Sequence, residues 1–172
     1  MQFKQHIQYI AKKGAEFALA IARIGKSIWG AQFQQLRHLF TAVAAPRMDY
    51  RASVWHRPTS YEQTTPPTQL TKLISAQQTA MKAILGGFRT TSTPALEIES
   101  TLAPTHLRLQ SKILRSFTRL QALPSNHPST AYVERAIRSQ STTSLTNLEY
   151  IARTFPEYAK PVEKIQPFIR PP

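Results

Sequence analysis

Cysteine is absent from this 172-residue chain, which excludes disulfides and thiolate metal sites. Acidic residues are scarce: there are nine in all, and Asp49 is the single aspartate. Two-metal phosphoryl transfer needs two or more carboxylates gathered around the ions. Since the glutamates are scattered, we predict no polymerase or nuclease centre. Long apolar runs are also missing. No stretch approaches the roughly 18 residues of a membrane span, so we expect no membrane partner.

Basic residues dominate the charge. The chain has 22 Lys and Arg and a formal net charge of +13. Residues 1–60 carry nine basic and two acidic side chains, and the remainder carries thirteen and seven. An excess spread along the chain indicates a charged folded surface, for which nucleic acid is the commoner partner. The first ten residues, MQFKQHIQYI, mix polar and apolar side chains unlike a secretory signal, so we expect an intracellular protein.

Apolar residues recur at helical spacing through most of the chain. We therefore predict an all-α bundle of about four to six helices joined by Pro/Gly-rich loops. Residues 1–130 should form one helical domain, and residues 131–172 short helical segments and a poorly ordered, proline-rich tail. The expected helices are 3–24, 30–46 with an end or kink at Pro46, MDYRASVW toward Trp55, 70–85, one from Thr93-Pro94, 104–123, and shorter ones in AYVERAIR and LEYIART.

Two glycines interrupt the middle of the chain in ILGGFRTTSTPALE, Ile84–Glu97. Gly86-Gly87 followed by Arg89 resembles a loop that contacts a phosphate. Helix punctuation explains the same residues more simply. Glycine supplies the left-handed conformation that ends a helix, and Thr93-Pro94 suits a helix start, with a hydroxyl cap and proline in the first turn. We predict a helix end, a loop and a helix start.

One predicted helix, 104–123, carries a basic stripe. Arg108, Lys112, Arg115 and Arg119 recur at i, i+4, i+7 and i+11, which places them on one face. The apolar residues of this helix lie on roughly the opposite side. No acidic residue occurs between Glu99 and Glu134 to neutralise the stripe. A solvated face and a polyanion contact both fit, and the net charge favours the second.

Aromatic residues beside cations offer a second binding feature. Trp55-His56-Arg57 and Phe88-Arg89 resemble surfaces on which bases stack, and Arg57 and Arg89 are added to the candidate nucleic-acid-binding residues. For Trp55 and Phe88 themselves a core position at a helix end is the favoured prediction. The apolar, basic stretch FALAIARIGKSIWG would also suit a membrane surface, which we rank last.

Catalytic and cofactor motifs are not found. The chain has no G-x-S-x-G, no P-loop and no G-x-G-x-x-G. Its five histidines are isolated, with no i, i+4 pair and no acidic companion, so we assign no metal site; they are His6, His38, His56, His106 and His127. We predict that the chain by itself is not an enzyme and binds no cofactor.

Three stretches in succession resemble one family, the non-LTR (LINE-type) retrotransposon reverse transcriptases of the fungal type. They are AAPRMDYRASVW (Ala44–Trp55), KLISAQQTAMKAILGGFRTTSTPALEIESTLAPTHLRL (Lys72–Leu109) and LQALPSNHP (Leu120–Pro128). They are similar to the family's P-x-x-D-Y…W, Q…A…ILG-FRTTPT-ALE, P…RL and LP…HP motifs, which follow the polymerase palm. FKQHI near residue 3 resembles the end of an earlier block. The FRTTSTPALE block is the most specific part.

The chain also departs from that family. The palm's Y/F-x-D-D carboxylates, the endonuclease and the RNase H domain have no counterpart here, and Arg51 stands where the family more often shows glycine. The resemblance implies an all-α thumb and connection fragment of a longer reading frame, whose basic surface grips RNA–DNA or DNA duplex through phosphates. It also implies the missing palm as a partner and, in the parent's context, a nuclear location. The alternatives are a helical protein-interaction module and a degenerate remnant without independent activity.

Overall fold

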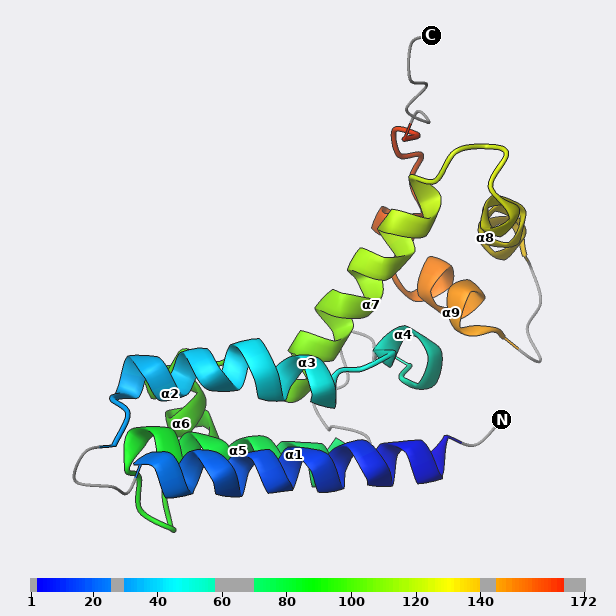
Figure 1. The fold of residues 1–172 in the computed structure, drawn as a ribbon. Helices are drawn as coiled ribbons and strands as arrows, with labels where there is room; N and C mark the ends of the chain where they lie inside the picture. The colour runs from blue at the N-terminus through cyan, green and yellow to red at the C-terminus, as the bar shows by residue number, and fades with distance from the viewer. Residues whose placement is uncertain (1–2, 26–29, 58–69, 140–144, 166–172) are drawn as a thin grey trace, which may run out of the picture. The chain divides into compact units, whose positions relative to one another are not determined.

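The computed structural model describes residues 3–25, 30–57, 70–139 and 145–165, and within these ranges it contains helices and no strand. The predicted all-α class is confirmed (Figure 1). One of the expected Pro/Gly-rich loops, the stretch PTSYEQTTPPT at 58–68, lies outside the described residues. The elements are α1 (Lys4–Gly25), α2 (Phe33–Leu39), the π-helical η1 (Phe40–Ala44), α3 (Ala45–Met48), α4 (Ala52–Trp55), α5 (Thr71–Leu85), α6 (Thr93–Ser100), α7 (Thr105–Gln121), α8 (Pro128–Arg138), α9 (Asn147–Thr154) and the 3₁₀-helical η3 (Pro156–Ala159).

Two compact units divide the chain. Unit 1 comprises Met1–Arg51 and Gln63–Arg108, and unit 2 comprises Ala52–Glu62 and Leu109–Pro172. This division differs from the expected boundary at residue 130. A compact unit is defined by which segments pack together, and here segments distant in sequence do so.

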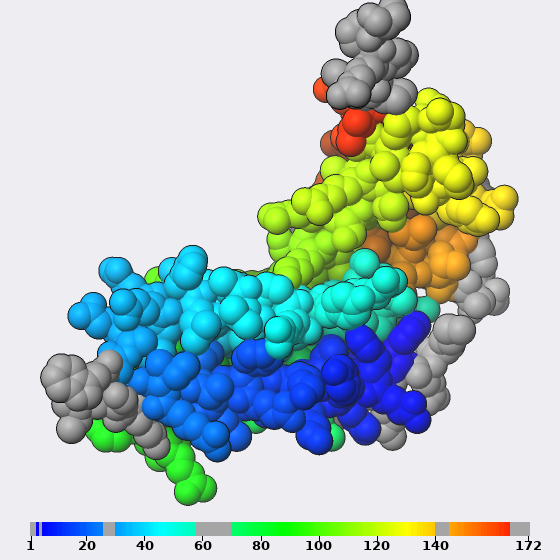
Figure 2. Space-filling model, viewed as in Figure 1, coloured from blue at the N-terminus to red at the C-terminus, as the bar shows by residue number. Residues whose placement is uncertain are grey.

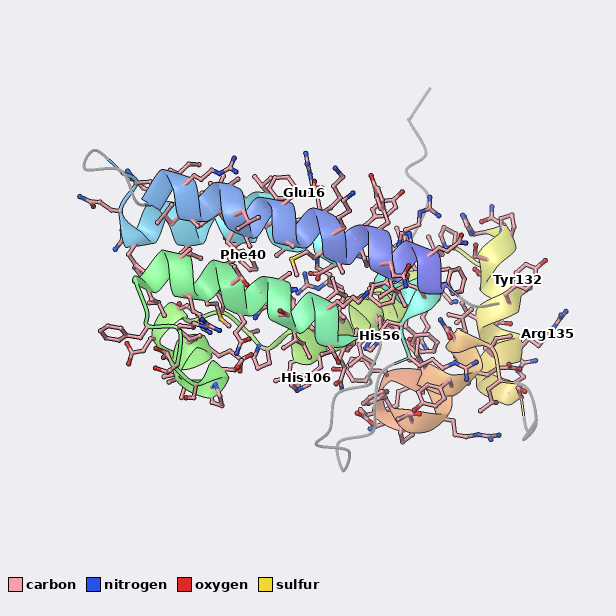
Figure 3. The ribbon with its side chains drawn as sticks, turned by 90° about the horizontal axis from the view of Figure 1, so that it is seen from below. Glu16, Phe40, His56, His106, Tyr132 and Arg135 are labelled. Atoms are coloured by element: carbon pink, nitrogen blue, oxygen red, sulfur yellow. The ribbon has the colours of Figure 1, made fainter. Side chains whose placement is uncertain are left out.

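Unit 1 is built on the pairing of α1 with α5. Gly14 of α1 lies against Ala76, and Gly25 lies against Ala83, so the two helices run parallel. The segment from α2 to α3 returns in the opposite direction along α1, since Gly25 also lies against Leu36 and Gly14 against Met48. Figure 2 shows α1 beside this returning segment on one face of the unit. Phe40, which is 1% exposed, belongs to the core of this layer (Figure 3).

Gly14 allows a close approach of three helices. A Cβ added there would lie 3.0 Å from Met48 Cγ and 3.4 Å from Ala76 Cβ. Glycine lowers the stability of the helix itself, but here it allows the three helices to pack closely. We expect Gly14→Leu to lower the free energy of unfolding by about 1–3 kcal/mol, because the core has no room for the added side chain. Ala15→Leu is the control, since Ala15 is exposed on the same turn. Equal urea midpoints for the two variants would contradict this packing argument.

Pro46 does not end its helix. The predicted end at Pro46 is wrong, because helical residues continue through the π-helical segment η1, in which the Ala45 amide donates to the Phe40 carbonyl five residues earlier. A wider turn relieves the clash of a proline ring with the carbonyl four residues before it. The helix then continues through α3 to Met48.

The expected helix over MDYRASVW is wrong at its centre. Residues 49–51 form a turn, and α4 begins only at Ala52. Arg51 has a φ of 50°, in the left-handed region where a side chain is strained. Its guanidinium Nε donates to the Tyr50 hydroxyl at 3.1 Å.

The conformation of Arg51 leads to a stability prediction. We expect Arg51→Gly to be more stable than Arg51→Ala by about 1 kcal/mol, because only glycine adopts a positive φ without strain. Both variants lose the Tyr50 contact, so their difference reports the backbone alone. Urea unfolding of the pair measures it, and an alanine variant as stable as the glycine variant would refute it.

The central glycines behave as predicted. Gly86 ends α5 with a φ of 64°, and the Gly87 amide donates to the Lys82 carbonyl at 2.9 Å. The start of α6 differs by one residue, since Ser92 is the cap and Thr93 is the first helical residue. The Thr93 hydroxyl instead accepts a hydrogen bond from the Gln78 amide.

Unit 2 contains most of α7, from Leu109 onward. Its buried apolar side chains come from α4, α7, α8, α9 and the residue after α9; they include Trp55, Ile113, Phe117, Val133, Ile151 and Phe155. The expected helices in AYVERAIR and LEYIART correspond to α8 and α9, which begin three residues and one residue earlier than expected and end where expected. The Thr146 hydroxyl accepts from the Glu149 amide, and the Glu149 carboxylate accepts from the Thr146 amide, a capping box that starts α9.

The tail is partly tied to α7. Lys164 Nζ donates to the Gln121 carbonyl at 2.9 Å, and the Ile165 amide donates to the Ala122 carbonyl. These bonds satisfy carbonyls that a helix end leaves without intrahelical partners. These bonds involve the tail only as far as Ile165, and the rest of the predicted poorly ordered tail, residues 166–172, lies outside the described range.

Candidate nucleic-acid interface

The α7 helix separates a buried apolar face from a basic one. Leu109 and Ile113 are 0% exposed and Phe117 is 1% exposed. On the opposite face Arg115 and Arg119 are exposed, and Lys112 is half-buried. The expected amphipathic pattern of this helix is confirmed.

Arg108, the first residue of the predicted stripe, has a different environment. Its Nε donates to Asp49 Oδ2 at 2.9 Å, and its Nη2 donates to Asp49 Oδ1 at 3.0 Å. The Asp49 side chain is 0% exposed and that of Arg108 is 15% exposed. The expectation that nothing neutralises the stripe is therefore wrong for Arg108, because an acidic residue 59 positions earlier packs against it. Arg108 is therefore not part of the exposed basic surface of α7.

Gln77 of α5 extends this pair into a buried network. Its side-chain oxygen accepts from Thr105 Oγ1 at 2.9 Å and from Arg108 Nη1, and its amide nitrogen donates to the Ala103 carbonyl at 2.9 Å. Gln77 is 1% exposed and Thr105 is 2% exposed. The first turn of α7 is thus held by hydrogen bonds to α5 and to the turn after α3, all within unit 1.

The remaining cations form the basic face, which we define as Lys112, Arg115 and Arg119 of unit 2. No acidic residue lies on α7 itself. Exposed Ser111 lies on the same side of the helix. Guanidinium, ammonium and hydroxyl donors on one helix face can contact successive phosphates without reading base edges.

Arg57 is engaged within unit 2. Its Nη2 donates to the Leu145 carbonyl at 2.9 Å and its Nε to Asn147 Oδ1 at 3.3 Å. Its guanidinium carbon lies 5.8 Å from the centre of the Tyr150 ring. These contacts hold the residues that start α9, so the structure gives Arg57 a structural role. The neighbouring Trp55 is 7% exposed, and its predicted core position is confirmed.

Phe88 is the reverse case. Its predicted core position is wrong, since 83% of the residue is exposed. The left-handed turn at Gly86 directs the chain away from α5 before Phe88 is reached, and the following Arg89 is exposed as well. Lys82 Nζ donates to the Arg89 carbonyl at 2.8 Å and closes the loop. Arg89 belongs to unit 1, so the structure does not join it with the basic face.

No metal centre is found in the described part of the chain, where no three His, Asp or Glu side chains gather. His127 instead caps α8, since its Nδ1 accepts from the Ser129 amide at 3.1 Å. Burial lowers the pKa of His106, which favours its neutral form. His56 is 6% exposed and lies 5.7 Å, ring centre to ring centre, from Trp55. None of the helices described is both long and apolar enough to cross a bilayer.

Comparison with protein families, with curated proteins and with solved structures finds no match to this chain.

Sequence reasoning missed the Asp49–Arg108 pair. The two residues are 59 positions apart, and nothing in their local patterns joins them. The available signal was that Asp49 is the single aspartate and stands in the P-x-x-D-Y stretch, while Arg108 stands in the P…RL stretch.

Proposed function

We propose that this chain is a thumb and connection segment of a LINE-type retrotransposon reverse transcriptase, and that it binds RNA–DNA or DNA duplex through phosphates. The observation that carries the proposal is the basic face of α7. Exposed Arg115 and Arg119, with Lys112 beside them, lie opposite a buried apolar face on a helix without acidic residues. Such a surface suits a polyanion and needs no base recognition.

Two structural features support the family assignment. Asp49 of the P-x-x-D-Y stretch and Arg108 of the P…RL stretch form one bidentate ion pair. This pair explains physically why a chain with one of these motifs would also have the other. Arg51 has a left-handed backbone at the position where the family more often shows glycine. Glycine adopts that conformation most easily.

In this proposal the chain carries no chemistry by itself. The polymerase carboxylates belong to the palm of the parent enzyme, and the segment contributes grip on the template–primer duplex. The parent would act in the nucleus, where a retrotransposon inserts.

One observation favours a second candidate, a helical protein-interaction module. Phe88 is 83% exposed and Ile98 is 74% exposed in unit 1, and large apolar side chains in contact with water suit a protein contact. In the parent enzyme the palm would be such a partner.

Fluorescence anisotropy with a labelled RNA–DNA duplex, measured across a salt series, tests the proposal. We expect the logarithm of the association constant to fall linearly with the logarithm of salt, by about 0.9 per phosphate neutralised. Absence of duplex binding at low salt would reject duplex grip and favour the interaction module.

A further inference from the structure

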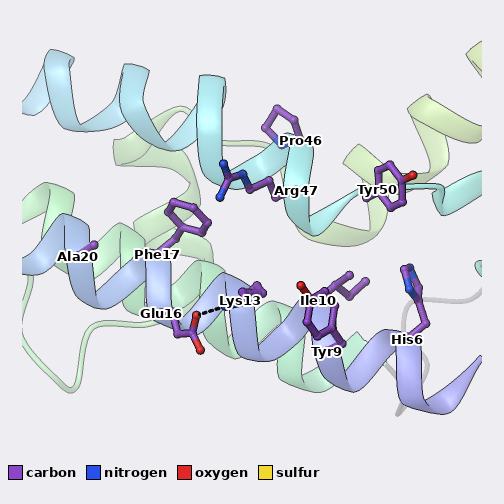
Figure 4. Close-up of a pocket in the computed structure, with 10 residues that line it drawn as sticks. All are labelled: His6, Tyr9, Ile10, Lys13, Glu16, Phe17, Ala20, Pro46, Arg47 and Tyr50. Carbon is purple, nitrogen blue, oxygen red and sulfur yellow. Dashed lines mark hydrogen bonds and ion pairs between the residues drawn. The ribbon is translucent and has the colours of Figure 1, made fainter.

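A groove in unit 1 lies between α1 and the segment from Pro46 to Tyr50 and encloses about 810 Å³. None of its lining residues belongs to the basic face of α7, which is part of unit 2. Figure 4 shows side chains of α1 facing those of α3 and of the turn after α3 across it. Its lining is mostly aromatic and aliphatic, with a few charged side chains.

Exposed aromatic rings line both sides of the groove. Tyr9 on α1 is 61% exposed and Tyr50 on the opposite side is 55% exposed. Phe17 follows Tyr9 by two helical turns, so about 12 Å of α1 carries one aromatic residue at each end. Planar rings accessible to solvent on two facing elements are platforms on which bases stack.

The charge of the groove is positive. Among the described residues that line it, Glu16 is the only acidic one, and Lys13 Nζ bonds to Glu16 Oε2 at 2.8 Å. The pKa of Lys13 is raised by that hydrogen bond and by the charge of Glu16, so Lys13 stays cationic. Arg47 adds a second cation, with its guanidinium carbon 4.7 Å from the centre of the Phe17 ring. Lys13 lies between Tyr9 and Phe17 on the same helix face, so cation and rings alternate along the groove.

We propose that this groove binds single-stranded nucleic acid, with bases stacked on Tyr9 and Tyr50 and a phosphate near Arg47. Because Glu16 is paired with Lys13, Arg47 is a surplus cation that suits an anionic ligand. The aromatic rings are exposed on both walls of the groove, where flat bases fit. The inference does not depend on duplex binding by α7.

The test is anisotropy binding of a labelled oligothymidylate of about ten nucleotides, a length within the site sizes of single-strand binding proteins. We expect the Tyr9→Ala/Tyr50→Ala variant to bind at least about 25-fold more weakly, since each stacked base is worth about fivefold or more. Tyr9→Phe/Tyr50→Phe keeps both rings and should bind within about threefold of the wild type, because stacking needs no hydroxyl.

Tyr132→Ala is the matched control. Tyr132 is 63% exposed on α8 of unit 2, with the Arg135 guanidinium carbon 5.9 Å from its ring centre, so it is also an exposed tyrosine beside an arginine (Figure 3). We expect it to bind as the wild type does. An equal loss in this control, or no loss in Tyr9→Ala/Tyr50→Ala, would overturn the proposal. Circular dichroism of each variant confirms that the fold is kept.

Photocrosslinking separates the groove from the α7 face. An oligonucleotide carrying 5-iodouracil should form adducts that map to Tyr9 or Tyr50 by mass spectrometry. The same adducts should form in a Lys112/Arg115/Arg119→Ala variant, whether or not that variant or the wild type binds duplex. Adducts confined to other residues would overturn the groove assignment. So would tyrosine-dependent binding of a polyglutamate peptide without binding of oligothymidylate, which would identify an acidic peptide as the ligand.

Discussion

Arg108→Ala should lower the free energy of unfolding by about 3–5 kcal/mol, because it leaves the buried Asp49 carboxylate without its cation. The Asp49 side chain is 0% exposed and accepts hydrogen bonds from both Nε and Nη2 of Arg108. Gln77 loses a donor in the same variant. A loss of this size is a large part of the free energy of unfolding of a small domain. We therefore expect a larger fraction of the variant molecules to be unfolded at room temperature.

Arg115→Ala is the matched control for this prediction, since it removes the same side chain from an exposed position of the same helix. We expect its effect to stay within about 0.5 kcal/mol. Urea unfolding followed by circular dichroism measures both. Arg108→Lys provides a milder variant should Arg108→Ala fail to fold. It keeps the charge but loses the planar bidentate geometry, and is expected to be destabilised by an intermediate amount.

A double variant tests whether the two residues act as a pair. Asp49→Ala/Arg108→Ala removes both charges, so no uncompensated charge remains buried. We expect the double variant to lose clearly less stability than the sum of the two single variants. Additive losses, or an Arg108→Ala variant as stable as Arg115→Ala, would show that the pair contributes nothing specific.

Loss of the basic face should weaken duplex binding and flatten its salt dependence. If Lys112, Arg115 and Arg119 each neutralise one phosphate, they account for a slope of about 2.7. Between 50 and 200 mM salt that slope corresponds to about a 40-fold change in affinity. We expect the Lys112/Arg115/Arg119→Ala variant to lose about this part of the salt dependence and to bind an RNA–DNA duplex correspondingly more weakly at low salt.

The control for this prediction removes the same charge elsewhere in unit 2. Arg135, Arg138 and Arg153 are exposed on α8 and α9, so Arg135/Arg138/Arg153→Ala lowers the net charge by the same three units. We expect this variant to keep most of the affinity and slope of the wild type, because its cations are outside the α7 face. Equal losses in the two variants would mean that net charge alone attracts the duplex and that α7 is no specific grip.

Local patterns in the sequence placed most of the helices. The apolar spacing in α1, α5 and α7 repeats at the helical period over several turns, and each of these helices lies where it was expected. Gly86 ends α5 as predicted because the need for a positive φ is a local property of the backbone. Arg115 and Phe117 lie on opposite faces of α7, as the same helical period predicts.

Local patterns misplaced the residues whose environment is set by other segments. Pro46 was expected to end or kink a helix, but a π turn before it lets the helix continue to Met48. Phe88 was expected in the core, but the loop after Gly86 carries it away from α5, and 83% of the residue is exposed to solvent. Arg51 was expected inside a helix, but it occupies a strained turn at the edge of unit 1.

The sequence by itself determined the all-α class, the basic surplus and the amphipathic character of α7, because periodicity and charge are properties of neighbouring residues. Only the tertiary structure decided which cations of that helix remain available. Arg108 and Arg115 stand on the same predicted stripe, yet one is bound to Asp49 and the other is exposed. That difference arises from the packing of segments 59 residues apart, and spacing along a single helix carries no information about such a contact.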